Sequence, residues 1–358
     1  MTVAPPGRGR ARRAWPWLKY GVGIALAALA AWAVAGRRGE LSGASAYLGN
    51  VRWWWLLLAV GAEAGSLVSF ALIQKRLLNA GHVQISTARL TGVTVAATAI
   101  ANSMPAGAVV SSVFAFRQYR RHGADEAVAG WVLVALFVAA SVALALVAGT
   151  GLAVAGAEGA GLDLVGVTVG VLVGALALGA VFLQRRALVW LVSTAVRSSR
   201  RVVGWPRGEV GEHVDNVIAR LTVVSLTARQ AVSAVGWGVA NWTLDCGCLA
   251  LSFLAVGVGV PWKGLLLAYG AGMLAANLPI TPGGLGVVEG SLTIALVAFG
   301  GSETSTVAAV LLYRVLSFWV GLPIGWTTWA ALSWRARRRT AAPAMAPRNA
   351  VDQQVVAS

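Results

Sequence analysis

Four ionisable residues lie within long apolar runs of the sequence: Glu63, Asp245, Glu289 and Arg314. A charge at the centre of a bilayer costs at least about 2.5–3.5 kcal/mol, so such groups usually pair, face a polar cavity or stay neutral. Glu289 and Arg314 can form an ion pair, and with substrate present Arg314 can instead hold an anionic phosphate by a bidentate contact. Glu63 and Asp245 can titrate and couple movement to a proton gradient. A purely structural ion pair, and neutral acids bonded to nearby backbone, remain the alternatives.

Two other apolar segments, 86–119 and 264–299, are interrupted near their middles. The interruptions read Asn102-Ser-Met-Pro105-Ala-Gly107 and Asn277-Leu-Pro279-Ile-Thr-Pro282-Gly283-Gly284-Leu-Gly286. Proline removes a helix donor and glycine weakens a helix, so each segment is predicted to form two short helices joined by a bend. Hydrocarbon cannot satisfy the freed backbone groups, which must face protein, water or a polar ligand. Asn102 and Asn277 either satisfy these groups or contact a substrate. Simple kinks are the alternative for each break.

A half-helix that begins after Pro105 or Pro282 points the positive end of its dipole at the bend. That end favours a phosphate or a carboxylate. The bends are therefore the predicted place for an anionic group, with Pro105, Gly107 and the second proline–glycine run as candidate substrate contacts.

The composition places the chain among membrane proteins, because 58% of its residues are hydrophobic and only 12% are charged. Apolar runs of sufficient length to span a bilayer occur at about 17–36, 53–74, 126–151, 163–183, 230–257 and 305–333. Arginines before residue 17 place the N-terminus in the cytoplasm, and basic residues flank segment 86–119 at both ends. That segment must therefore enter and leave from the cytoplasmic side, and segment 264–299 from the outside. This assignment places Arg37, Arg38 and Arg52 outside the cell, against the rule that basic loops are cytoplasmic.

The two halves of the chain, about 53–151 and 230–333, resemble each other. Glu63-Ala-Gly-Ser-Leu matches Asp245-Cys-Gly-Cys-Leu, each in the helix before a broken segment. Inverted repeats with broken helices at matching places indicate a transporter site near the midplane. The sequence thus predicts an all-α integral membrane protein with about six spanning helices and two oppositely oriented re-entrant helical hairpins in an inverted repeat. The membrane domain covers 17–334, with a basic cytoplasmic tail at 1–16, a basic cytoplasmic loop at 184–229 and a basic, disordered cytoplasmic tail at 335–358.

Several functions are disfavoured by the same residues. The net charge of +16 clusters at the ends of apolar runs, which indicates membrane topology rather than nucleic-acid binding. Cys246 and Cys248 have no histidine nearby and predict neither a metal site nor a disulfide. No nucleophile, base and metal set is apparent at membrane depth, so we expect neither an enzyme nor a cofactor.

One motif carries a family resemblance. The run Asn277-Leu-Pro-Ile-Thr-Pro-Gly-Gly-Leu-Gly-Val-Val-Glu-Gly290, followed by Leu312-Tyr-Arg314, resembles the flippase-like transmembrane domain of lysylphosphatidylglycerol synthases. That domain also occurs alone in YbhN-type membrane proteins. Pro105-Ala-Gly107 with Phe116-Arg-Gln-Tyr-Arg-Arg-His-Gly123 is similar to the first motif of the family. Many relatives have an arginine and a glutamate shortly after the first-motif proline, where this chain has Ala106 and Ala108-Val109-Val110. By this resemblance, the functional positions of the family correspond here to Pro282, Gly283, Gly284, Gly286, Glu289 and Arg314.

The resemblance implies a multi-pass protein of the bacterial plasma membrane, with both termini cytoplasmic, that moves a phospholipid or lipid-linked anion between leaflets. Its partners would be membrane lipids with an anionic or lipid-linked phosphate head group, and a second copy of the chain or an envelope-synthesis enzyme. The alternatives are a small-solute permease, with a cavity open only to water, and a non-transporting membrane partner of an envelope-assembly enzyme, which needs no polar cavity.

Overall fold

The computed structural model describes residues 51–104, 107–157, 226–276 and 281–341, with single positions between 170 and 177. Every regular element in these ranges is helical. The predicted spans 17–36 and 163–183, the tail 1–16 and most of the loop 184–229 lie outside the described residues. The elements are α3 (Trp53–Ala80), α4 (Thr87–Ser103), α5 (Gly107–Arg121), α6 (Glu126–Ala157), α10 (Ala228–Ala255), α11 (Trp262–Ala276), η1 (Pro282–Gly284), α12 (Val287–Ala298), α13 (Glu303–Arg314), η2 (Val315–Trp319) and α14 (Gly321–Ala341).

Four spans within the described ranges are long and apolar enough to cross a membrane. They are Trp53–Ala80, Glu126–Val154, Ala228–Ala255 and Glu303–Trp334. These coincide with the predicted spans at 53–74, 126–151, 230–257 and 305–333. The prediction of a helical, multi-pass membrane protein is therefore confirmed.

The last span differs from the single helix expected at 305–333. It divides into α13 and α14, joined by the π-helical turn η2, in which the Val320 N–H donates to the Val315 carbonyl at 2.9 Å. Pro323 lies in the first turn of α14 and has no N–H to offer the carbonyl of Trp319. A π turn is a common way to absorb such a mismatch, and it often occurs at functional sites. α14 then continues to Ala341, so the tail expected to be disordered from residue 335 begins as helix, and 342–358 lie outside the described residues.

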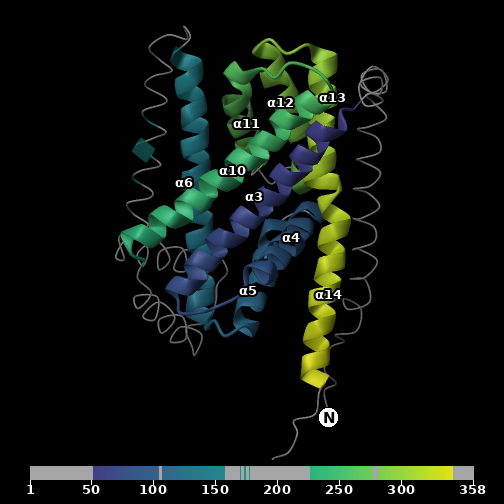
Figure 1. Ribbon diagram of the computed structural model, residues 1–358. Coiled ribbons are helices and arrows are strands. Elements are labelled where there is room, and N and C mark those ends of the chain that lie inside the picture. Colours follow the sequence, from purple (N-terminus) through teal and green to yellow (C-terminus); the bar gives the residue numbers. More distant parts are fainter. Residues whose placement is uncertain are drawn as a thin grey trace, which may run out of the picture.

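The two broken segments form helical hairpins in opposite halves of the molecule. α4 contacts α5 around the break at 105–106, and α11 contacts α12 around η1. Figure 1 shows the first hairpin in the lower half and the second in the upper half, while α6 and the α13–α14 pair run along most of the height. The two hairpins meet, because η1 at the tip of the second contacts α4 of the first.

The long helices α3 and α10 cross the centre of the bundle side by side (Figure 1) and make the most extensive helix pair. α10 begins with a capping box in which the side chains of Thr227 and Gln230 bond each other's backbone N–H groups. Near the middle of the pair, Asn241 donates to the Ser66 carbonyl at 3.0 Å and to its hydroxyl at 2.7 Å. The matched segments around Glu63 and Asp245 therefore face each other across this contact.

Small residues allow close helix packing elsewhere, as is usual between membrane helices. A Cβ atom at Gly151 of α6 would lie 2.6 Å from the backbone nitrogen of Leu267 in α11. A Cβ atom at Gly325 of α14 would lie 2.6 Å from the carbonyl oxygen of Val95 in α4. Each hairpin is thus packed through a glycine contact against a long helix, α6 or α14.

We predict that Gly151→Ala lowers the stability of the purified protein by about 1–3 kcal/mol, because the added methyl group overpacks a backbone contact. Gly130→Ala on the same helix is the matched control, since a Cβ atom there meets nothing within 4 Å. Thermal unfolding in detergent measures both variants. Equal midpoints for the two would contradict the close approach of α6 to α11.

Candidate functional site

The guanidinium of Arg314 lies at the tip of the second hairpin. Its Nε donates to Glu289 Oε1 at 2.7 Å and its Nη2 donates to the Gly283 carbonyl at 3.1 Å. The ring of Phe318 stacks on it with 4.6 Å between the guanidinium carbon and the ring centroid. The ion pair is buried, with 8% of the Arg314 side chain and 14% of the Glu289 side chain exposed. The predicted pairing of Glu289 with Arg314 is thus present in the structure.

The glycines of the second hairpin are required by its backbone. Gly283, Gly284 and Gly286 have φ angles of +59°, +69° and +81°, a region that residues with a side chain rarely adopt. Gly283 also packs directly on Phe318, whose ring would lie 2.2 Å from a Cβ atom. The turn ends at Gly286, whose N–H donates to Glu289 Oε2 at 2.7 Å and so begins α12. Glu289 therefore caps the helix terminus to which an anion was predicted to bind.

A second polar group lies between α3, α10, α11 and α13. Asp245 accepts a hydrogen bond from the Tyr269 hydroxyl at 2.6 Å and from the Tyr313 hydroxyl at 3.1 Å. The carboxyl groups of Glu63 and Asp245 also lie against each other. Glu63 Oε2 is buried and has no hydrogen-bond partner among the described residues. The structure thus brings together the two acids that occupy matching positions of the sequence repeat.

Adjacent residues of α13 connect the two polar groups. Tyr313 donates to Asp245, whereas Arg314 donates to Glu289 and interacts electrostatically with Asp245. A continuous series of polar side chains therefore runs from Glu63 on α3 to the start of α12. The π turn η2 follows immediately after Arg314.

Two buried hydroxyl groups flank this series without a hydrogen-bond partner in the described part of the chain. Thr281 precedes Pro282 at the hairpin tip, and Ser317 lies in η2. Buried polar groups are normally bonded, so unpartnered ones mark a strained or functional site. Thr281 directly precedes the hairpin tip that contacts Arg314, and Ser317 follows Arg314 by three residues.

The first hairpin contributes less to the candidate site. Asn102 is half-buried at the end of α4, and its side chain makes no hydrogen bond to a described residue. Gly107 begins α5, where a Cβ atom would lie 2.2 Å from the Ala101 carbonyl oxygen, so this glycine is needed for the bend itself. The neighbouring Ser103 hydroxyl accepts from the Trp326 ring nitrogen at 3.0 Å. Pro105 and Asn277 lie outside the described residues.

Neutral hydrogen bonds hold the first hairpin in place. Gln74 of α3 donates to the Thr94 hydroxyl at 2.7 Å and accepts from the Tyr119 hydroxyl at 2.8 Å. All three side chains are buried. This cluster was not predicted, because its members are widely separated in the sequence and none is charged.

Sequence reasoning also missed the partners of the charged residues. Phe318 and Ser317 follow Arg314 by one turn, so their proximity could have been read from helical spacing. Tyr313 is adjacent to Arg314 in the sequence and belongs to the motif, but its bond to Asp245 depends on the packing of α13 against α10. No pattern links Tyr269 to Asp245.

Comparisons with known proteins agree on a family. A family model described as "Lysylphosphatidylglycerol synthase TM region" matches residues 18–325. A UPF0104 membrane protein of Methanothermobacter thermautotrophicus is 39% identical over 77 residues, which make up 22% of this chain and 22% of the relative. A second UPF0104 membrane protein of that organism is 29% identical over 85 residues, or 24% of this chain and 25% of the relative. Each alignment covers a quarter or less of the length of these relatives.

We predict strong coupling between Glu289 and Arg314. Glu289→Gln or Arg314→Met alone should destabilise the protein by about 3–5 kcal/mol, because each leaves a charge buried without its partner. The double variant should lose less than the sum of the two. The exposed pair Arg120–Glu126, with a 3.1 Å contact and 41% and 44% exposure, is the matched control and should show coupling of about 1 kcal/mol or less. Unfolding in detergent measures both cycles, and equal coupling in the two pairs would contradict the buried contact.

Proposed function

The chain belongs to the lysylphosphatidylglycerol synthase transmembrane-region family, and from this premise we propose that it moves a lipid with an anionic head group between the leaflets of the plasma membrane. The observation that carries the proposal is the buried Arg314 guanidinium at the tip of a broken helix, beside the unpartnered hydroxyls of Thr281 and Ser317. A phosphate can replace the Glu289 carboxylate on the guanidinium and accept hydrogen bonds from these hydroxyls. The role we propose is transport rather than catalysis.

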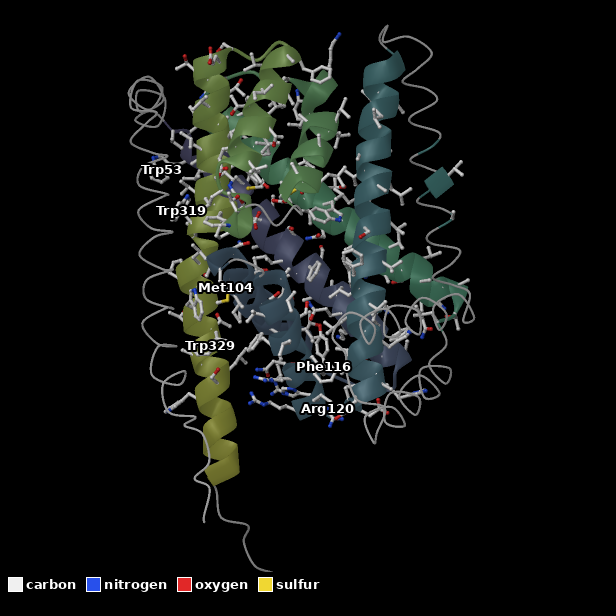
Figure 2. The ribbon with its side chains drawn as sticks, turned by 180° about the vertical axis from the view of Figure 1, so that it is seen from behind. Trp53, Met104, Phe116, Arg120, Trp319 and Trp329 are labelled. Atoms are coloured by element: carbon white, nitrogen blue, oxygen red, sulfur yellow. The ribbon has the colours of Figure 1, made fainter. Side chains whose placement is uncertain are left out.

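The surface next to Arg314 favours a lipid over a small solute. Val315, Trp319 and Val320 belong to the turn that follows Arg314, and all three are exposed. Figure 2 shows Trp319 about halfway up the molecule, with Met104 of the first hairpin a little below it. A head group at Arg314 can therefore stay close to the apolar surface, which leaves its acyl chains in hydrocarbon.

We propose in addition that both hairpins are re-entrant and that the two halves form an inverted repeat. The opposite placement of the hairpins and the contact between η1 and α4 support this arrangement. The basic end formed by α5 and the start of α6 would then face the cytoplasm, together with both termini. The tips would meet near the midplane, where transporters commonly place the substrate site.

Glu63 and Asp245 are the proposed proton carriers. Two buried carboxyl groups that lie against each other can share a hydrogen bond only if one of them carries a proton. Because Asp245 already accepts from two tyrosine hydroxyls, we place the shared proton on Glu63. The bond from Tyr313 to Asp245 links this proton to the adjacent Arg314, so a change of protonation would act on the residue that holds the head group.

We predict that Arg314→Ala and Glu289→Ala each reduce lipid movement at least tenfold, since the first removes the anion contact and the second removes the group that releases it. The assay is reconstitution of the full chain into vesicles, with fluorescent lipids of several head groups followed by reduction of the outer leaflet. Arg229→Ala, an exposed cation at the start of α10, should transport normally. Undiminished movement in both site variants, or movement of a water-soluble phosphate but of no lipid, would reject the proposal.

We predict that Glu63→Gln keeps transport but removes its response to a pH gradient, because the amide preserves the size of the side chain and cannot release a proton. Asp125→Asn is the matched control, as this acid caps α6 through the Val128 N–H at 2.7 Å, outside the site. The measurement is the lipid-movement rate with and without an imposed gradient of one pH unit. A gradient response retained by the Glu63 variant would remove this residue from the coupling mechanism.

A further inference from the structure

Helix α5 presents an exposed face that changes from valine to arginine along its length. Val109, Val110 and Val113 are exposed near the hairpin tip, and Arg117, Arg120 and Arg121 are exposed at the opposite end. At 3.6 residues per turn these six positions share about one third of the helix circumference. The buried face of α5 is different, since it carries Ala115, Gln118 and Tyr119.

Most of the positive charge at this end of α5 has no acidic partner among the described residues. Arg120 pairs with Glu126 at 3.1 Å, but Arg117 and Arg121 make no ion pair with any described residue. Figure 2 shows Phe116 and Arg120 near the lower end of the molecule, where nitrogen-rich side chains gather. The face therefore offers cations beside an apolar surface.

The dimensions of this face correspond to one leaflet of a bilayer. The rise from Val109 to Arg117 is about 12 Å, close to the roughly 15 Å that half of a hydrocarbon core occupies. Val109 lies two residues from the start of α5 at the bend, and α4 on the other side of that bend contacts η1. A lipid with its phosphate at the arginines would therefore have its chain ends beside the hairpin tips.

We propose that this face of α5 binds an anionic phospholipid, with the phosphate at Arg117 and Arg121 and an acyl chain along Val113, Val110 and Val109. The charge pattern selects the ligand: a zwitterionic lipid brings no net charge to two guanidinium groups that pair with no acid in the described part of the chain, whereas an anionic lipid does. The role of this face as the place where substrate is collected before it reaches Arg314 rests on the proposed function, but the binding site does not.

Native mass spectrometry of the full chain in detergent tests the site, with dioleoyl phosphatidylglycerol and dioleoyl phosphatidylcholine as probes. We expect the wild type to retain phosphatidylglycerol preferentially. The double variant Arg117→Gln/Arg121→Gln should have an apparent affinity for phosphatidylglycerol about 25-fold weaker than the wild type, because each arginine near the head group contributes a factor of roughly five. The control Arg76→Gln/Arg89→Gln removes two exposed cations from the ends of α3 and α4, where no row of exposed valines lies beside them. It should change the affinity for phosphatidylglycerol less than twofold.

The remaining outcomes overturn the proposal. Equal losses in the two double variants would show a general charge effect, and equal retention of both lipids would show that charge does not select the ligand. Competition by glycerol 3-phosphate at the lipid concentration would show a site for the head group alone, without the chain contact. Lipid movement is measured on the same Arg117→Gln/Arg121→Gln variant, in which Arg314 is intact, so failure of transport and failure of the α5 site are measured separately.

Discussion

Hydrocarbon offers no hydrogen bonds, and the second hairpin is organised around this constraint. Its bend frees the Gly283 carbonyl and the Gly286 N–H. Arg314 satisfies the first and Glu289 the second, and the two side chains neutralise each other. The ion pair therefore satisfies the backbone groups that the bend leaves without helix partners, and it is also a candidate anion site. A head group that takes Glu289's place on the guanidinium must leave both backbone contacts intact, and the geometry allows this because each contact uses a different atom from the ion pair itself.

The two hairpins are held to neighbouring helices by different kinds of side-chain contact. The first is held to α3 by the neutral side chains of Gln74, Thr94 and Tyr119. The second is held by charges on α10, α12 and α13. A charged ligand competes directly with a carboxylate for Arg314, but it has no comparable position among three neutral groups. The ligand-dependent changes that the proposed transport requires are thus favoured in the second hairpin.

The sequence predicted the described spans and both hairpins because length, apolarity and proline–glycine breaks are local properties. It also suggested an ion pair between Glu289 and Arg314, since pairing is one of the ways in which charges are accommodated in lipid. Bonds between distant residues, such as Tyr269 with Asp245, depend on how helices pack and leave no local pattern. The π turn after Arg314 had a visible cause in Pro323, but a proline in a membrane helix is equally compatible with a simple kink.

In the proposed mechanism, the position of Arg314 on α13 couples a proton to a head group without a long pathway. Tyr313 reaches Asp245 on one side while Arg314 reaches Glu289 on the other, so a single helical turn holds both groups. The turn that follows, η2, lacks the regular helical bond pattern and packs through Phe318 on Gly283. A shift of α13 that lengthens the Tyr313 bond must also move the guanidinium relative to the hairpin tip. Coupling then requires only that α13 has two positions. The proton acts through Tyr313 and the head group binds Arg314, and these two residues are adjacent on the same rigid helix.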